Sequence, residues 1–468
     1  MTQSQSPSTA SKVPHIFIIL ISIIFLVAVM SYILPAGEYT RVTGPGGRLI
    51  IDPSSFHYVD KNPTTLIQFF EAIPTGFVEA GWVVVLTFCV GGGFVVLKKT
   101  GAIHSCIHYL SRRLAKRGIV IIPILMMTFA LIDCFIGMCE LTMVYVPIIL
   151  PLILALGFDS ITACAIALCG SAAGFTAALA NPFTVGIGQK IAGLPLYSGW
   201  QFRLAVFILM TSVAIVYVMR YARRIQKNPE RSQMYEQDQR TRNDLEIRDE
   251  PKVSVRQTLA GLTALGLFIL MIYGVFNWSW DMPQIGAIFI SIGIFSGLVA
   301  GMKGNQICEA FYEGCNDVLL GALIVGIARG VGVVMTNAKI VDTIIYGLAS
   351  AVQNLHGSVT SVGMLIVQTL LNFLIPSGSG QTVVSMPIMA PLADIVGVTR
   401  QTAVLALQFG DGFSNILYPV SGYFMATLAL GRVPWEKWVK FILPLFFIWT
   451  GLAAIVLVIA QTIQWGPF

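Results

Sequence analysis

The sequence predicts an all-α polytopic membrane protein built from two related halves. The chain has 468 residues, of which 56% are hydrophobic and only 11% are charged, whereas about 25% of the residues of a typical soluble domain are charged. One soluble core could not cover so much apolar surface, so we expect lipid to surround it. Residues 135–170 also align with residues 375–410 without a gap, at a constant offset of 240.

The two copies share prolines, glycines and threonines at matching positions. These pairs are Thr142/Thr382, Pro147/Pro387, Pro151/Pro391, Gly157/Gly397, Thr162/Thr402 and Gly170/Gly410. Each copy then continues through a stretch rich in small residues to a second proline, Pro182 or Pro419. Apolar segments that are interrupted at matching places in two halves indicate a binding site near the midplane of a membrane transporter.

Apolar runs predict the full membrane crossings. The first run, Ile16–Leu34, is longer than the core of a signal peptide, which covers about 7–15 residues, so we interpret it as a membrane anchor. Further spans are expected at Gly81–Leu97, Trp200–Met219, Thr258–Phe276, Ile285–Gly301, Gly314–Met335 and Trp438–Ile459. Two broken segments, near 160–192 and 399–430, bring the expected total to about eight or nine spans.

The distribution of Lys and Arg predicts the orientation of the chain. Residues 98–118 contain six basic and no acidic side chains, and the polar linker 220–256 contains ten basic and seven acidic ones. Both are expected in the cytoplasm, together with the N-terminal tail 1–15. The loop 35–80 has five acids and three bases and is expected outside. We therefore expect a multi-pass membrane protein with its N-terminus in the cytoplasm.

These orientations agree only if residues 119–157 enter and leave from the cytoplasm, and residues 358–396 from the outer side. Each segment would then be a re-entrant hairpin, which is tolerated only where protein or water covers it; ordinary pairs of transmembrane helices are the alternative. The amphipathic stretches 101–117 and 339–355 would be connecting arms or interfacial helices. The expected domains are the halves 16–219 and 257–468 on either side of the linker.

The hairpin tips provide candidate ligands for a substrate. A helix that begins after a turn exposes free N–H groups and the positive end of its dipole, which suits a carboxylate. The first turn lies near 137–142 and the second at 376–382. Hydroxyl and amide partners at these turns are Thr142, Ser377, Ser379, Gln381 and Thr382. An ordinary Gly/Ser loop is the alternative for the second turn.

The two broken helices offer further polar groups. Gly and Pro interrupt the backbone hydrogen bonds of a helix and free carbonyls that can coordinate a cation. Asn181 and Asn415 are candidates for substrate binding, and Ser171, Thr184 and Ser414 for binding a coupling ion, either Na⁺ or H⁺. A kinked structural helix is the alternative.

Charged residues inside the membrane are costly unless they are paired or hydrated. Glu140 at the first turn and Asp411 in the second break have no basic neighbour in the sequence, which favours an amino acid, particularly a cationic one, over a dianion. Either acid could instead carry a proton, as could Asp133. Arg329 lies within an apolar run, where it could pair with Asp317, Asp411 or a substrate carboxylate.

Other classes of protein receive little support from the sequence. The eight cysteines are scattered without a CxxC motif, no metal site or cofactor is indicated, and the net charge of +6 belongs to the loops rather than to a nucleic-acid site. His104 and His108 have a spacing that could bind metal but lack a third ligand. An enzyme would need a catalytic cluster, for which Cys139 beside Glu140 is a weak candidate. A channel would need a continuous polar pore.

Several motifs resemble a known family of transporters. Residues 33–39 (ILPAGEY), the turn 137–140 (GMCE), residues 376–381 (PSGSGQ) and residues 408–415 (QFGDGFSN) are similar to the YfcC/ArcD-type basic amino-acid antiporters. These are relatives of the DcuC-type C4-dicarboxylate carriers. The resemblance covers nearly the whole chain. It implies a homodimer, a static scaffold and an elevator-type transport domain that holds the substrate between the hairpin tips and the broken helices.

The family resemblance leaves two substrate classes open. Its dicarboxylate members often carry Ser-Asn-Thr at the hairpin tips, but here the tips read 139–142 (CELT) and 379–382 (SGQT). We therefore expect a secondary transporter that exchanges basic amino acids, as in arginine/ornithine antiport. A C4-dicarboxylate carrier coupled to Na⁺ or H⁺ is the alternative.

Overall fold

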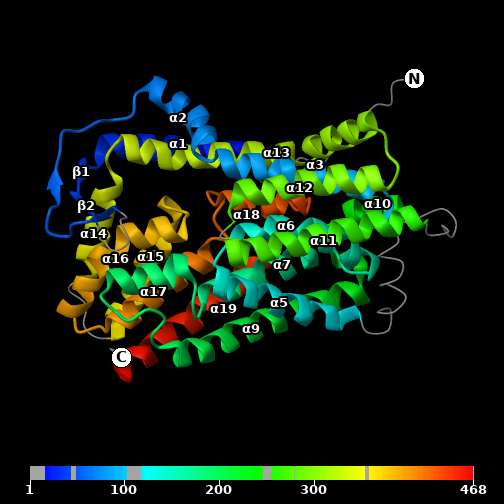
Figure 1. Cartoon of the computed structure of the whole chain (residues 1–468). Coiled ribbons are helices and arrows are strands. Elements are labelled where there is room, and N and C mark those ends of the chain that lie inside the picture. Colours follow the sequence, from blue (N-terminus) through cyan, green and yellow to red (C-terminus); the bar gives the residue numbers. More distant parts are fainter. Residues whose placement is uncertain are drawn as a thin grey trace.

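The long helices of the computed structural model run roughly along one axis (Figure 1). The structure describes residues 16–43, 49–102, 118–245, 254–278, 280–353 and 358–466. The longest apolar helices are α1 (Ile16–Ile33), α3 (Gly81–Lys99), α9 (Trp200–Lys227), α11 (Val255–Trp278), α12 (Met282–Val299), α13 (Gly304–Asn337) and α19 (Trp435–Thr462). The prediction of a helical membrane protein with several apolar spans is confirmed.

Seven helical segments in the described ranges are long and apolar enough to cross a membrane. Six of them coincide with predicted spans. The seventh, Gly118–Ile136, lies in the predicted first hairpin and was not expected to be of spanning length. The predicted span Thr258–Phe276 falls in α11, whose apolar segment Val255–Met271 is shorter than these seven segments.

Both predicted hairpins are pairs of helices joined by a short turn. The first consists of η1 (Gly118–Val120), α5 (Ile121–Ile136), η2 (Cys139–Leu141) and α6 (Thr142–Ala155), and the second of α15 (Ser358–Leu374) and α16 (Gly378–Ile395). Each ends at a glycine with positive φ, Gly157 at +85° and Gly397 at +73°, a conformation that glycine adopts without steric cost. Whether the hairpins are re-entrant remains a prediction.

The two broken helices begin after these glycines and break where the sequence predicts. The first consists of α7 (Ser160–Thr176), the π-helical turn η3 (Pro182–Gly186) and α8 (Ile187–Ile191), and the second of α17 (Arg400–Ser414) and α18 (Gly422–Leu430). Asp159 caps α7 and Thr399 caps α17, each accepting a hydrogen bond from the N–H three residues later. The equivalent caps show that the repeat extends from the sequence to the backbone.

The packing of the helices follows the same repeat. The hairpin helices α5 and α6 pack on α7, and α15 and α16 pack on α17. The short helices cross over, because α8 packs on α16 and α18 packs on α6. The helices α7 and α17 cross so closely that a Cβ at Gly412 would overlap Thr176. The four segments therefore form one interleaved unit.

A second group of helices packs around α13, which contacts α1, α3 and α2 (Leu66–Glu79). Small residues let these backbones approach one another. A Cβ at Gly314 would overlap the backbone of Gly91, and one at Gly93 would overlap the backbone of Phe289. This group includes α12 and α11, and it meets the interleaved unit mainly where α18 packs on α13, with smaller contacts of α6 on α3 and of α15 on α13.

Several elements differ from the sequence prediction. The loop 35–80 contains α2 and four short strands, which were not expected from the sequence. The strands are β1 (Gly37–Glu38), β2 (Arg41–Thr43), β3 (Leu49–Ile51) and β4 (His57–Tyr58). They form two antiparallel pairs, in which Gly37 faces Tyr58 and Arg41 faces Ile51. The linker contains η4 (Pro229–Arg231) and the helix α10 (Tyr235–Leu245).

Only parts of the two predicted arms lie within the described residues. The helix α14 (Val341–Gln353) matches the predicted arm 339–355. Most of the arm 101–117, including His104 and His108, lies outside the described residues.

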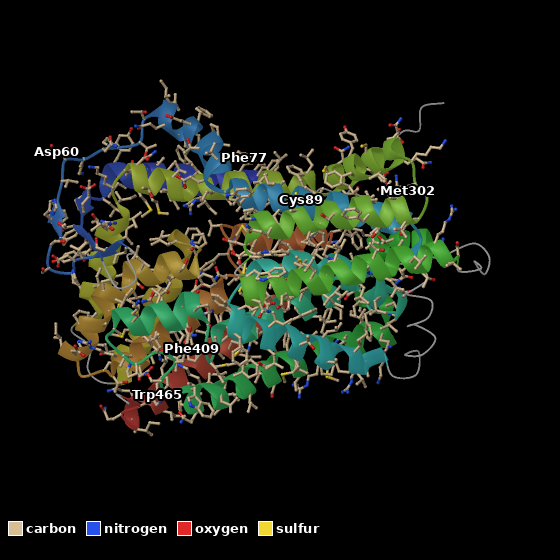
Figure 2. All side chains as sticks on the ribbon, viewed as in Figure 1. Asp60, Phe77, Cys89, Met302, Phe409 and Trp465 are labelled. Carbon is tan, nitrogen blue, oxygen red and sulfur yellow. The ribbon has the colours of Figure 1, made fainter. Side chains whose placement is uncertain are left out.

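Asp60 and Trp465 lie at one end of the molecule and Met302 at the other (Figure 2). This separation agrees with the relative placement of the predicted outer and cytoplasmic loops, whereas the absolute orientation remains a prediction.

Candidate substrate site

The tips of both hairpins meet the breaks of the two broken helices. Gly137 at the first tip has φ +70° and lies directly against the side chain of Asn181. Gly378 at the second tip is so close to Asp411 and Thr184 that a Cβ there would lie 2.9 Å from Asp411 Oδ2 and 3.0 Å from Thr184 Cγ2. The structure thus brings together polar residues that are far apart in the sequence.

Asn181 organises the first break. Its Oδ1 accepts hydrogen bonds from the N–H groups of Phe183 at 2.8 Å and Thr184 at 3.3 Å, which caps the π-helical turn. Its Nδ2 and the hydroxyl of Thr184 are buried and make no hydrogen bond within the described structure. Because buried polar groups are normally paired, these two atoms are free to bind a ligand.

Asp411 lies at the centre of a hydrogen-bond network in the second break. Asn415 Nδ2 donates to Asp411 Oδ1 at 3.0 Å, while Asp411 Oδ2 is buried and has no partner in the part of the chain described. Asn372 Nδ2 lies 3.0 Å from Asp411 O, 2.7 Å from Ser414 Oγ and 3.2 Å from Asn415 Oδ1. The backbone and neighbours of Asp411 are held in place, and one carboxylate oxygen is left open.

Asn372 was not identified from the sequence. It is a buried amide at the end of α15 and contacts three parts of the second break. A signal was present, because an amide within an apolar helix has to find a polar partner. Its position about one turn before the predicted tip could have assigned it to the site.

The N-terminus of α16 forms the second tip. Ser377 is exposed, and its Oγ accepts the Gly380 N–H at 3.3 Å; Ser379 is half-buried. Thr382 Oγ1 donates to Gly378 O at 2.6 Å, and Gln381 Nε2 donates to Gln368 O at 2.8 Å. In this conformation, Gln381 and Thr382 therefore support the tip from the inside, and the two serines are its accessible hydroxyls.

Thr142 connects the first hairpin to the second broken helix. Its hydroxyl donates to Cys139 O at 2.7 Å and lies 2.9 Å from the hydroxyl of Thr427 on α18. Thr427 in turn donates to Tyr423 O at 2.7 Å. This chain of hydroxyl groups fixes α6 against α18.

Three acidic residues lie near this meeting point without a basic partner. Asp133 is fully buried and neither of its oxygens is hydrogen-bonded, although Ser171 and the backbone of Met138 approach it. Glu140 is half-buried on η2, close enough to Asp411 for the two charges to repel each other. The ion pairs of the described residues are Arg41–Asp342, Lys99–Glu313, Arg329–Glu79, Lys339–Glu38, Arg400–Asp394 and Arg432–Asp317. None of them includes Asp133, Glu140 or Asp411.

The two protein partners predicted for Arg329, Asp317 and Asp411, are wrong. Its Nε donates to Glu79 of α2 at 2.8 Å, and Asp317 pairs instead with Arg432. The deeply buried arginine is instead Arg203 of α9, whereas the Arg329 side chain is 42% exposed. Arg203 donates to Gln408, one turn before Asp411, and stacks on Trp465 at 5.3 Å. The sequence analysis did not identify Arg203, because it lies within an apolar run that predicts a membrane span.

Comparison with known proteins identifies the family. The sequence model of the family described as DcuC, C4-dicarboxylate anaerobic carrier, matches residues 13–462. The chain belongs to the DcuC family. It is therefore a multi-pass membrane transporter of a bacterial family and not an enzyme, as the sequence predicted.

Two curated relatives cover nearly the whole chain. An Escherichia coli (strain K12) protein described as "Putative basic amino acid antiporter YfcC" is 31% identical over 97% of this chain and 98% of its own length. An uncharacterized protein of Haemophilus influenzae (strain Rd) is 28% identical over 95% of this chain and 96% of its own length. The predicted relationship to YfcC-type and DcuC-type transporters is confirmed.

Two solved transporters show a weaker likeness to the DcuC-family chain. MtrF of Neisseria gonorrhoeae, from a class of antimetabolite efflux pumps, has 19% identity and a TM-score of 0.41 over 97% of this chain and 96% of its own. The Alcanivorax borkumensis YdaH transporter has 16% identity and a TM-score of 0.40 over 97% and 100%.

Proposed function

We propose that this DcuC-family protein exchanges basic amino acids across the bacterial inner membrane. The observation that carries the proposal is the open carboxylate oxygen of Asp411 beside the second hairpin tip. Glu140 and Asp133 add negative charge nearby, and no described Lys or Arg pairs with any of the three. A buried site that carries excess negative charge is stabilised by a cationic ligand.

Each end of an amino acid has a partner in this arrangement. Asp411 and Glu140 would bind its cationic groups. The N-terminus of α16, with Ser377 and Ser379, would bind its carboxylate, because free N–H groups and the helix dipole favour an anion. The free Nδ2 of Asn181 and the amide of Asn415 would orient the substrate between these ends.

Coupling to an ion would use the remaining polar groups. Asp133 with Ser171 could exchange a proton, because the carboxyl is buried without a hydrogen bond. Thr184 and Ser414, with carbonyls released at the breaks, are the candidates for Na⁺. Neither ion is required for strict amino-acid exchange.

The interleaved packing of the repeats supports an elevator-type mechanism. The hairpins and broken helices would move together against the α13 group, with the N-terminus and the linker 220–256 in the cytoplasm. The protein would act as a homodimer. Ala155 and Ile395 occupy equivalent exposed positions in the repeat, so they test this topology: A155C should be labelled from the cytoplasm and I395C from outside. Labelling of both from the same side would refute the inverted repeat.

A C4-dicarboxylate carrier is the second candidate, because the description of the matching family model favours it. The two functions are separated by flux into proteoliposomes. One set is loaded with ornithine and given labelled arginine, and the other is loaded with succinate and given labelled fumarate. Arginine entry that depends on internal ornithine would support the proposal. Fumarate entry without an arginine signal would overturn it and reassign Glu140 and Asp411 to proton or cation coupling.

A further inference from the structure

A cavity of about 510 Å³ lies between α13 and the second hairpin. Leu374, Ile375 and Val384 form its hairpin wall, immediately around the tip, and Arg329, Gly332 and Thr336 form one face of α13. The strand segment 37–41 and the start of α14 close the remaining side. The cavity thus adjoins the hairpin that covers Asp411, but Asp411 itself is not part of its lining.

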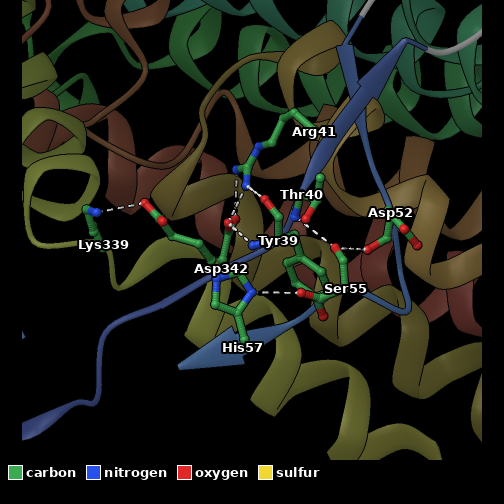
Figure 3. Close-up of polar contacts among 9 residues, drawn as sticks. Tyr39, Thr40, Arg41, Asp52, Ser55, His57, Lys339 and Asp342 are labelled. Carbon is green, nitrogen blue, oxygen red and sulfur yellow. Dashed lines mark hydrogen bonds and ion pairs between the residues drawn. The ribbon is translucent and has the colours of Figure 1, made fainter. Parts of the chain in front are cut away.

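Of the three basic residues of this cavity, Lys339 forms an exposed pair with Glu38 at 3.1 Å, and Arg41 and Arg329 differ in how firmly they are held. Arg41 binds both oxygens of Asp342, at 2.5 and 3.0 Å, and Asp342 also accepts the Tyr39 N–H at 3.0 Å (Figure 3). The Asp342 side chain is only 5% exposed. Because removing one partner would leave a buried charge unpaired, Arg41 anchors the strands to α14 and is not available to a ligand.

Arg329 is held much more weakly. It makes a single hydrogen bond to Glu79, and the two side chains are 42% and 40% exposed. An exposed ion pair contributes about 0–1 kcal/mol, so a competing carboxylate can replace Glu79. Gly332 lies one turn further along α13, and a Cβ there would have only the Arg329 guanidinium within 4 Å, at 3.7 Å. Space is therefore open beside this guanidinium.

We propose that this cavity is an outer binding vestibule in which Arg329 binds the carboxylate of an amino acid before the substrate passes the second hairpin. The planar guanidinium can make two parallel hydrogen bonds to a carboxylate. Thr336, which is exposed one turn beyond Gly332, provides a hydroxyl for the same ligand. The identity of the ligand rests on the function proposed above.

Two substitutions with opposite expected effects test the vestibule. In right-side-out membrane vesicles, R329Q should raise the outer KM for arginine about tenfold with kcat unchanged. E79Q releases the guanidinium from its partner and should lower the outer KM. In inside-out vesicles, neither variant should change the KM. If the Arg329–Glu79 pair were only structural, both variants would impair transport in the same direction, which would overturn the proposal.

A matched control lies at the other end of α13. Lys99 pairs with Glu313 and is also 42% exposed, so K99Q removes a comparable pair and should leave the outer KM unchanged. A tenfold increase in the outer KM of K99Q would show that R329Q acts by general destabilisation.

If wild-type vesicles exchange fumarate but not arginine, the proposed function fails. The same variants then test the vestibule with fumarate, whose carboxylates need the same guanidinium, and an unchanged KM in R329Q would refute it.

Discussion

The two halves of the molecule share a backbone but place their buried acids differently. In the first half, Asp133 lies on the hairpin helix α5 and approaches Ser171 of the broken helix. The equivalent residues of the second half are Phe373 and Asp411, so there the broken helix carries the acid. Each half thus has one carboxyl group where a hairpin helix meets a broken helix, supplied from opposite sides of the contact.

The surroundings of these acids also differ. Asp411 accepts a hydrogen bond from Asn415, and Asn372 ties its backbone to Ser414. Asp133 accepts no hydrogen bond within the described structure. The second half therefore holds its acid through a side-chain hydrogen bond, and the first half does not. Under the function proposed above, the two copies of one repeated fold would differ in role, with Asp411 binding the substrate and Asp133 serving in coupling.

The largest effect is expected where only one half requires glycine. Gly412 contacts Thr176, whereas its counterpart in the first half is Ala172. G412V should lower the free energy of unfolding by about 3 kcal/mol, since a well-packed crossing cannot accept added methyl groups, and should abolish transport. Thermal unfolding of the purified protein measures the first effect and vesicle flux the second. A172G should retain transport; equal loss in both variants would show that the halves do not differ here.

A pH effect should be specific to the start of the first broken helix. Asp238 of α10 accepts the Ser160 N–H at 2.9 Å, and burial raises the pKa of its carboxyl from 3.8 to about 6. An acid with a raised folded-state pKa stabilises the protein fully below pH 3.8 and loses this contribution as the pH rises through 6. The loss should reach about 3 kcal/mol near pH 7.

The D238N variant should lack this dependence, since the amide cannot ionise but can still accept the Ser160 N–H. Unfolding midpoints between pH 4 and pH 7.5 provide the measurement. Glu236 is exposed on the same helix, and E236Q should retain the wild-type slope. A wild-type slope in D238N as well would show that Asp238 is not the titrating group.

Substitutions of Asp411 and Asp133 should affect the kinetics of transport differently. D411N should raise the KM for a cationic substrate at least tenfold, about 1.4 kcal/mol, and E140Q should do the same. D133N should leave the KM nearly unchanged and alter the dependence of flux on the pH gradient. Flux in proteoliposomes at several internal and external pH values measures both. Unchanged affinity in D411N and E140Q would remove these residues from the site.

The smallest difference is expected between the paired threonines. Thr142 bonds across to Thr427 on another helix, whereas Thr382 bonds to Gly378 within its own turn. T142V should therefore lower the free energy of unfolding by about 1 kcal/mol, and T382V by less. Denaturant or thermal unfolding of the two variants compares them directly, and a larger loss in T382V would contradict the assignment.

The sequence predicted the parts of the fold that depend on local patterns. The two turns and the two breaks follow from the offset of 240 residues, and both appear in the structure. The four strands have two or three residues each, too few to show an alternating pattern. Arg203 and Asn372 lie inside apolar runs, where a single polar residue does not alter the prediction of a helix.

The contacts of the site could not be predicted in the same way. Gly378 meets Thr184 and Thr142 meets Thr427, and both contacts join residues from different halves. Sequence alignment of the repeat shows which residues are equivalent, but equivalent residues are not the ones that touch. The predicted pairing of Arg329 failed for a related reason, because α2 was not expected and its Glu79 is the actual partner.

The crossing of α7 and α17 at Gly412 and Thr176 has a mechanical consequence. With only the Thr176 side chain between the two backbones at this point, neither helix can tilt or slide past the other without separating the crossing. A hinge between the two repeats would have to pass through this contact. Under the proposed function, a displacement that carries a bound solute would therefore move both repeats as one body, and the duplicated halves would not rock against each other.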